Sequence, residues 1–310
     1  MSGKIHSINI SEKKGVQKTP VESVEMVNDF GIKTDAHAGK WHRQVSFLAQ
    51  ESIDKMVAKG LNVKGGDFAE NITTIGVDLV SMKVGERLKI ADVEFVISQL
   101  GKLCHNRCAI YHAAGDCVMP REGIFGVVKG NGGVKLGDTV EKLPKESITV
   151  AVVTLSDKGS KGERVDETGP ALIEMVKKEL NPSFTRLELI PDEVDQLKNI
   201  IKYLIDIQGF DLVITNGSTG LSPRDIAPDA TIELIEKRLP GFEEAMRMES
   251  FKKTPHALLS RAVCGTRKDS IILNVPGSPK GAVENLGVVI KALPHAIKKL
   301  QGDTADCAAK

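Results

Sequence analysis

The chain has 310 residues, of which 41% are hydrophobic and 27% charged, a composition typical of globular proteins rather than disordered or membrane-spanning ones. This length predicts about two domains, each able to bury a core. With 42 Lys and Arg against 41 Asp and Glu, the net charge of +1 provides no general attraction to nucleic acid, although a local basic pocket for a small phosphate ligand stays open.

The first ten residues alternate polar and apolar side chains without a basic start before an apolar core, so they predict a strand rather than a secretory signal. No apolar run reaches the ~20 residues that a membrane-spanning helix needs. Five cysteines, an odd number, in a chain without such a signal indicate reduced thiols. We therefore expect a cytoplasmic protein without a membrane partner.

Residues 1–143 contain short apolar runs separated by Gly and Asp, which predicts a mainly β, barrel-like domain. The runs are 5–10, 87–90, 93–100, 126–128 and 139–143. One helix is expected over residues 50–59, where Ile53, Met56 and Val57 fall on one face.

Three cysteines of this half, Cys104, Cys108 and Cys117, follow a C-x3-C-x8-C spacing that departs from the CxxC pairs of ordinary zinc sites. A thiolate is a soft ligand and a nucleophile, so one of them beside Arg107 could bind molybdenum or carry a persulfide sulfur. The alternative is that they are small buried residues without a reaction.

Polar residues elsewhere in this half have two interpretations. They either line the same pocket as orienting groups or form turns, and the set is Asp35, His37, Asp67, Glu70 and Asn71. Arg43 is either an anion contact, because a guanidinium suits a phosphate, or a surface charge.

Four stretches of this half carry a family resemblance. GIKTDAHAG at 31–39, HRQVSFL at 42–48, GDFAENI at 66–72 and GKLCHNRCAIYHAAGDCVMPREGIFG at 101–126 resemble the MOSC domain, named after the C-terminal part of molybdenum cofactor sulfurases. The resemblance covers most of residues 1–143. It implies one functional cysteine that binds the molybdenum cofactor or carries sulfur, with Cys108 in RCAIY as the best match and Cys104 as the second. It also implies pyridoxal phosphate binding as a family-level association.

After a short linker at residues 144–146, the pattern changes in residues 147–310. A continuous apolar run at 148–155 is typical of a strand covered on both faces. Further strands are predicted at 184–190, 211–215 and 270–275, and helices at 167–180, 194–207 and 230–238. This β-α-β order predicts an α/β three-layer domain with a mostly parallel sheet.

Helix starts and breaks in this half follow from local residues. Asp229 is suited to cap the helix at 230–238. Ser278 can cap the last helix, with Pro279 in its first turn, and Pro294 should bend or interrupt that helix.

Polar residues follow each predicted parallel strand, and the carboxyl ends of such strands meet at one edge of a sheet, where α/β proteins place ligands. They are Ser156, Asp157, Asp192, Thr215, the loop Gly217, Ser218, Thr219 and Gly220, and then Asn274, Pro276 and Gly277. Glycines in such a loop expose backbone N–H groups to anions. Neither GxxxxGK[ST] nor a helix-opening GxGxxG is present, and each residue alone could be a turn or cap.

Five separated motifs of the second half, TNGSTG, SPRDIAPDAT, LPGFEEAMR, LSRAVCG and NVPGSPKG, resemble in this order the molybdopterin adenylyltransferase family of molybdenum cofactor biosynthesis. The resemblance covers roughly residues 147–303. It implies transfer of AMP from Mg-ATP to molybdopterin with release of pyrophosphate. Asp192 and Asp225 match the family's functional acids and suit magnesium, which keeps several waters and needs few protein ligands.

The resemblance also implies ligand contacts. The glycine loop, Arg224, Ser260 and Arg261 would contact phosphate, while the segment Asn274 to Gly277 would shape a wall. The usual family loop reads TGGTG, whereas this chain has Asn216 and Ser218. A positive φ at Ser218 would cost on the order of 1 kcal/mol, which a site can tolerate.

The leading hypothesis is a fused protein in which both halves handle one pterin. A non-catalytic pterin carrier and a sulfur-transfer protein using Cys108 are the alternatives. The expected partners are the pterin, the nucleotide and other cofactor-assembly enzymes, and adenylyltransferase relatives imply a homo-oligomer such as a trimer.

Overall fold

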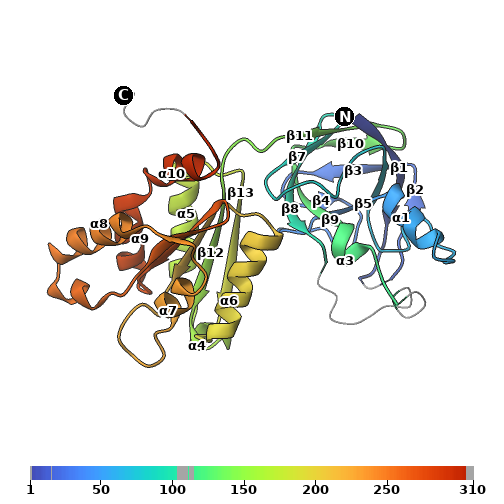
Figure 1. The fold of residues 1–310 in the computed structure, drawn as a ribbon. Helices are drawn as coiled ribbons and strands as arrows, with labels where there is room; N and C mark the ends of the chain where they lie inside the picture. Colours follow the sequence, from blue (N-terminus) through green and yellow to red (C-terminus); the bar gives the residue numbers. More distant parts are fainter. Residues whose placement is uncertain (1, 15, 103–110, 112–114, 305–310) are drawn as a thin grey trace. The chain divides into compact units, whose positions relative to one another are not determined.

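The computed structural model describes every residue except 1, 15, 103–110, 112–114 and 305–310. The chain divides into two compact units, residues 1–146 and 147–310 (Figure 1). Each unit encloses a hydrophobic core of its own. In the described part of the chain, no helix is both long enough and apolar enough to cross a membrane.

The first unit is a closed barrel. Its eight-stranded sheet curls until β11 pairs with β1 as well as with β7, so that seven strands form a ring. Around the ring lie β1 (Ser2–Ile10), β6 (Ile72–Ile75), β5 (Val45–Ala49), β9 (Ile124–Lys129), β8 (Val93–Leu100), β7 (Arg87–Ile90) and β11 (Thr139–Leu143), and β2 (Thr19–Val21) pairs with β1 outside it. Closure leaves the ring without free edges and confirms the predicted barrel.

The core of the barrel consists of buried hydrophobic side chains of the ring strands. Phe47 and Phe95 meet edge to face inside it, with ring centroids 5.3 Å apart. All five residues of β5 are buried, so this strand lacks the alternation that marks the others. A second small sheet contains β3 (Ser23–Val27), β4 (Gly31–Ile32) and β10 (Gly132–Lys135). The described residues of this unit include the helices α1 (Gln50–Val57) and α3 (Met119–Glu122).

Helix α1 confirms the predicted helix, but its buried face differs at one position. Ser52, Ile53 and Met56 are buried, whereas Val57 is 47% exposed. The helix ends at Val57, so its last side chain lies beyond the surface that the barrel covers.

The second unit is built on a six-stranded mixed sheet. The strands in spatial order are β13 (Phe184–Ile190), β12 (Thr149–Leu155), β14 (Leu212–Asn216), β17 (Ser270–Val275), β16 (Cys264–Arg267) and β15 (Lys237–Arg238). The first four pair in parallel, as predicted. The last two pair antiparallel, so the expectation of a mostly parallel sheet missed this edge, where β15 contains two residues and leaves little pattern to read.

Helices cover both faces of this sheet (Figure 1). Helices α5 (Thr168–Leu180), α8 (Pro240–Phe251), α9 (Pro279–Val289) and α10 (Leu293–Leu300) contribute to one core with the inner residues of β12, β14 and β17. Helix α6 (Val194–Lys202), which continues as a π-helical turn over Tyr203–Ile207, and α7 (Ala227–Ile232) pack together on the other face. Right-handed crossovers to opposite sides of β12 account for this arrangement.

Local residues determine most helix boundaries. The Ser278 hydroxyl accepts a hydrogen bond from Gly281 N–H and caps α9, and α10 begins around Pro294, as predicted. The predicted cap at Asp229 is wrong, because α7 begins at Ala227 and places Asp229 inside its first turn. Helix α7 also ends at Ile232, and the end of the predicted 230–238 helix is strand β15.

The core of the second unit should tolerate little loss of volume. Leu273 is fully buried in β17, and replacing it with Ala should lower the free energy of unfolding by about 3 kcal/mol, because a cavity is left behind. The matched change Leu258→Ala, at a side chain 67% exposed, should lower it by less than about 0.5 kcal/mol. Guanidinium unfolding followed by circular dichroism measures both, and equal losses would contradict the core assignment.

Candidate functional site

A pocket of about 670 Å³ opens at the carboxyl edge of the parallel strands in the second unit. It is called the acidic pocket here because Asp157, Asp166, Glu167, Asp192 and Asp225 line it. The residues predicted for the site that contribute to its lining are Ser156, Asp157, Asp192, Gly217, Ser218, Asp225 and Gly277. These residues follow four different strands, so the topology brings together side chains that are distant in sequence.

A second pocket, of about 360 Å³, borders the same glycine loop further along the chain. It is called the basic pocket here because Arg247, Lys253 and His256 line it, together with hydroxyl groups and one acid, Glu284. Four predicted residues lie in its lining, namely Thr219, Gly220, Ser260 and Pro276. Ser278 lines both pockets, which therefore adjoin at the start of α9.

The glycine loop, residues 217–220, is shaped by close backbone contacts. Gly217 has φ = +92°, and a Cβ there would lie 2.6 Å from the carbonyl oxygen of Leu155. Ser218 has φ = +57°, so the positive φ considered from the sequence is present. Its hydroxyl donates to Arg224 O at 2.9 Å and accepts from Ile226 N–H at 2.8 Å, which offsets the conformational cost.

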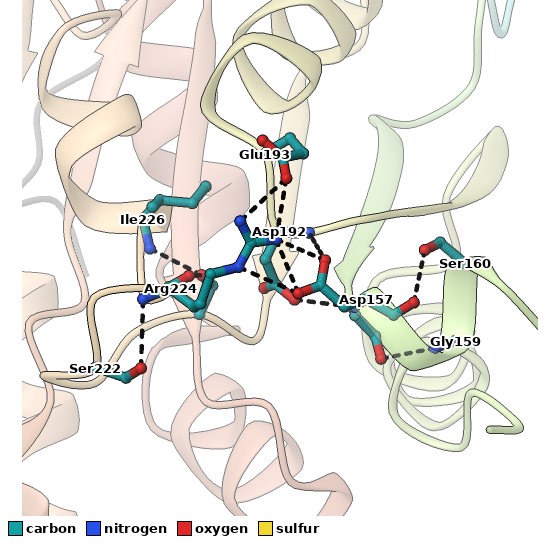
Figure 2. Close-up of polar contacts among 10 residues, drawn as sticks. Asp157, Gly159, Ser160, Asp192, Glu193, Ser222, Arg224 and Ile226 are labelled. Carbon is teal, nitrogen blue, oxygen red and sulfur yellow. Dashed lines mark hydrogen bonds and ion pairs between the residues drawn. The ribbon is translucent and has the colours of Figure 1, made fainter. Parts of the chain in front are cut away.

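Two acids at the pocket rim hold each other in place. Asp157 N–H donates to Asp192 Oδ2 at 2.9 Å, and Asp192 N–H donates to Asp157 Oδ1 at 3.1 Å (Figure 2). Burial raises the pKa of Asp192, the neighbouring charge of Asp157 raises it further, and the hydrogen bond from Asp157 N–H and the charge of Arg224 oppose the rise. Hydrogen bonds from Arg224 lower the pKa of Asp157. The two carboxylates thus differ in their tendency to bind a proton.

The two arginines expected to contact phosphate both have partners within the protein. Arg261 donates from Nε to Gly220 O at 2.8 Å and from Nη2 to Asp225 O at 2.6 Å, and pairs with Asp229 at 2.9 Å. Arg224 donates to Asp157 and Glu193 (Figure 2). Both guanidinium groups therefore fix the segment that follows the glycine loop.

Thr215 and Asn274 lie behind the pockets rather than in their described lining. The Asn274 side-chain amide donates to the hydroxyls of Thr215 at 2.7 Å and Thr231 at 3.0 Å, and its oxygen accepts from Val263 N–H at 3.1 Å. These buried bonds join β14, β17 and α7, so the two residues position the edge.

Sequence reasoning missed Asp166 in the acidic pocket. Its carboxylate accepts from the N–H groups of Thr168 and Gly169 at 3.0 and 2.9 Å and from the Thr154 hydroxyl at 2.7 Å. The Thr168 hydroxyl in turn donates to Gly277 O at 2.8 Å. An acid two residues before a helix that starts Thr-Gly-Pro is a capping pattern, and that pattern was available in the sequence.

In the first unit, three predicted polar residues have structural partners. Asp67 accepts from Lys64 N–H at 2.9 Å, as a turn residue does. Asn71 accepts from both the N–H and the hydroxyl of Ser46. Glu70 is fully buried and accepts from Gly66 N–H at 2.6 Å, and burial raises its pKa. Arg43 lies over the Trp41 ring, 4.8 Å from its centroid.

Asp35 forms a buried ion pair with Lys18, a residue that the sequence did not single out, and the half-buried His37 lies beside this pair. Asp35 accepts from Lys18 Nζ at 2.6 Å, and both side chains are 1% exposed. Asp35 also accepts from His37 N–H at 2.9 Å and lies 3.2 Å from His37 Nδ1. Burial lowers the pKa of Lys18, whereas the bonds from His37 and Lys18 outweigh the effect of burial on Asp35 and lower its pKa.

The thiols are only partly described. Cys104 and Cys108, the candidates for molybdenum or sulfur, and the neighbouring Arg107 lie outside the described residues. Cys117 is buried at 8% exposure beside the Leu48 and Met119 side chains. In the described part of the chain, no group of three or more His, Cys, Asp or Glu side chains is arranged to hold a metal ion.

The Lys18–Asp35 pair predicts a large effect of a small change. Asp35→Asn leaves a buried ammonium without its counter-charge and should lower the free energy of unfolding by about 3 kcal/mol at pH 7. Because the folded pKa of Asp35 is lowered, the stability it contributes is present above the unfolded pKa and is lost as pH falls, so the difference should shrink in acid.

Trp41, the one tryptophan of the sequence, reports unfolding of this unit by fluorescence. Glu25→Gln, in an exposed pair with Lys33, is the control and should change stability by less than about 0.5 kcal/mol. A wild-type stability for Asp35→Asn would show that the pair does not carry buried charge.

Comparison with known proteins agrees with both units. Residues 34–141 match the MOSC domain model, and residues 151–295 match a model described as a probable molybdopterin binding domain. The chain is 40% identical over 159 residues to the molybdopterin adenylyltransferase of Helicobacter pylori strain J99, a match that covers 51% of this chain and 90% of that enzyme. The Escherichia coli K12 molybdopterin adenylyltransferase is 35% identical over 175 residues, with 52% and 90% covered.

Two further matches are a multidomain-length relative and a solved structure, each covering about half of this chain. Gephyrin of Dictyostelium discoideum is 37% identical over 162 residues, which cover 49% of this chain and 22% of gephyrin. The structure of the molybdopterin biosynthesis enzyme MoaB from Thermus thermophilus is 45% identical with a TM-score of 0.47, and the match covers 50% of this chain and 98% of that one.

The α/β fold with two pockets at a glycine loop thus defines the second unit as a domain of the molybdopterin-binding class. The chain belongs to the molybdopterin adenylyltransferase family through this unit, and its first unit is a MOSC domain.

Proposed function

We propose that the second unit transfers AMP from ATP to molybdopterin and releases pyrophosphate. The observation that carries this proposal is the pair of adjoining pockets, one acidic and one basic, on the two halves of the glycine loop. In this reaction the phosphate of one substrate attacks a phosphate of the other, so the two substrates need adjoining binding sites. Relatives named molybdopterin adenylyltransferase, 35–40% identical over this unit, support the same reaction.

The chemical obstacle is repulsion between two anions, so the protein must supply N–H donors and cations more than a strong base. The attacking phosphate is already ionised near pH 7, and neither Asp192 nor Asp225 is required as a proton acceptor. The glycine loop and the start of α9, where Ser278 forms the cap, supply backbone N–H groups and the positive end of a helix dipole. Arg247 and Lys253 supply positive charge in the basic pocket.

Magnesium fits the donor set of the acidic pocket. Asp192 and Asp225 both line it, and an ion that takes most of its ligands from phosphates and water needs no larger cluster of protein acids. These two residues would hold the ion, which when bound neutralises phosphate charge. Asp225 Oδ2 accepts from Ser222 N–H at 2.7 Å, so this carboxylate is oriented before any ligand arrives.

Removal of one acid tests the reaction. Purified Asp225→Ala, incubated with molybdopterin and Mg-ATP, should release pyrophosphate at least about 100-fold more slowly than the wild type, because one charge-stabilising group is lost. The control Asp195→Ala removes an acid on the exposed side of α6 and should leave the rate unchanged. Wild-type protein that binds molybdopterin without releasing pyrophosphate would instead support the carrier alternative.

For the first unit, we propose that the MOSC domain holds the molybdenum cofactor or carries its sulfur, with Cys108 as the functional thiol. The family match over residues 34–141 supports this assignment. If sulfur transfer takes place, a persulfide trapped with an alkylating probe and detected by mass spectrometry should disappear in Cys108→Ala and persist in Cys104→Ala. Loss of the persulfide in Cys104→Ala alone would move the role to Cys104.

A further inference from the structure

The side chain of Arg224 joins three loops at the carboxyl edge of the second unit (Figure 2). It belongs to the segment after β14, and its Nη2 donates to Asp157 Oδ1 and Oδ2 at 2.8 Å, directly after β12. Its Nη1 and Nη2 both donate to Glu193 Oε1 at 3.0 Å, directly before α6. One planar guanidinium group thus donates hydrogen bonds to two carboxylates from different loops.

The contact continues from Asp157 to Asp192. The reciprocal bonds of these two acids, at 2.9 and 3.1 Å, tie the orientation of the Asp157 carboxylate to the backbone that carries Asp192. Asp157 and Asp192 line the acidic pocket, whereas Arg224 lies outside the described lining of both pockets. Arg224 thus contacts an acid of the acidic pocket without contributing to the described lining of either pocket.

We propose that Arg224 is a positioning residue for the reaction: through Asp157 it holds the Asp192 carboxylate at the pocket rim and balances the charge of Asp157 and Glu193, and it does not itself bind substrate phosphate. This inference rests on the proposed function of the acidic pocket. It replaces the phosphate contact that the family resemblance implied for Arg224.

The charges around Asp192 explain why such a residue is needed. Asp157 and Glu193 lie beside it and Asp225 lines the same pocket, so three acids surround the position where an anionic substrate has to enter. Arg224 is the cation that contacts this group in the described structure, and Lys158 from α4 (Asp157–Ser160) and Arg164 contribute positive charge to the pocket lining.

The test uses the full-length protein and the variants Arg224→Gln, Arg224→Lys and Asp157→Asn, with pyrophosphate release as the readout. Arg224→Gln should lower kcat about tenfold and change KM for Mg-ATP by less than about twofold, since geometry rather than binding is lost. Arg224→Lys restores the positive charge but lacks the planar group that binds two carboxylates, so it should recover only part of kcat.

A double-mutant cycle separates the two possible roles of Arg224. If it acts through Asp157, adding Arg224→Gln to Asp157→Asn should lower kcat by less than about twofold more. If Arg224 binds phosphate directly, the two losses multiply and KM for Mg-ATP rises in Arg224→Gln, which overturns the inference. The control is Arg267→Gln, which removes a comparable pair with Asp206 at the opposite end of β17 and should leave kcat and KM unchanged.

The inference can fail separately from the proposed function. The same cycle, run between Arg224→Gln and Asp192→Asn on the free energy of unfolding, needs no substrate and should show coupling between the two residues. Coupling without pyrophosphate release from the wild type would reject the proposed reaction and retain the contact network. Independent losses in the unfolding cycle would reject the positioning role even in an active enzyme.

Discussion

The arrangement of the second unit depends on a backbone contact that leaves no room for a side chain. A Cβ on Gly277 would lie 3.0 Å from the Cα of Gly217, and a Cβ on Gly217 would lie 2.6 Å from Leu155 O. The segments after β12, β14 and β17 are thereby packed backbone to backbone at one point of the sheet edge. This contact sets the position of the glycine loop and of the start of α9, and the two pockets are the spaces that remain on either side of that loop.

Much of this edge was predictable, because periodic apolar runs locate parallel strands and the residues that follow them must meet. Ser156, Asp192 and Gly217 were found in this way. The basic pocket was not, since Arg247 comes from α8, His256 from the 3-10 helix Pro255–Leu259 and Lys253 from the turn between them, and no local pattern says which of these side chains face the loop. The partners of Arg224 also depend on tertiary structure, because Asp157 is 67 residues away in sequence.

The two units handle charge in different ways. In the barrel, the side chains of Lys18 and Asp35 are both buried. Each buried charge is stabilised by the opposite charge of the other. At the sheet edge, Arg224 and Asp157 are 54% and 39% exposed, so water and salt screen their attraction more than that of the buried pair. The sequence suggested a polar cluster at Asp35 and His37 but not Lys18, which lies in a segment with no motif of its own.

Ser278 contributes to the walls of both pockets. A ligand that fills one pocket therefore rests against a residue that the ligand of the other pocket also meets, so each ligand can influence the binding of the other through Ser278. Thermodynamic linkage requires this influence to be mutual: whatever factor the nucleotide applies to the affinity for the pterin, the pterin applies to the affinity for the nucleotide. The order in which the two arrive then affects the path to the ternary complex but not its stability.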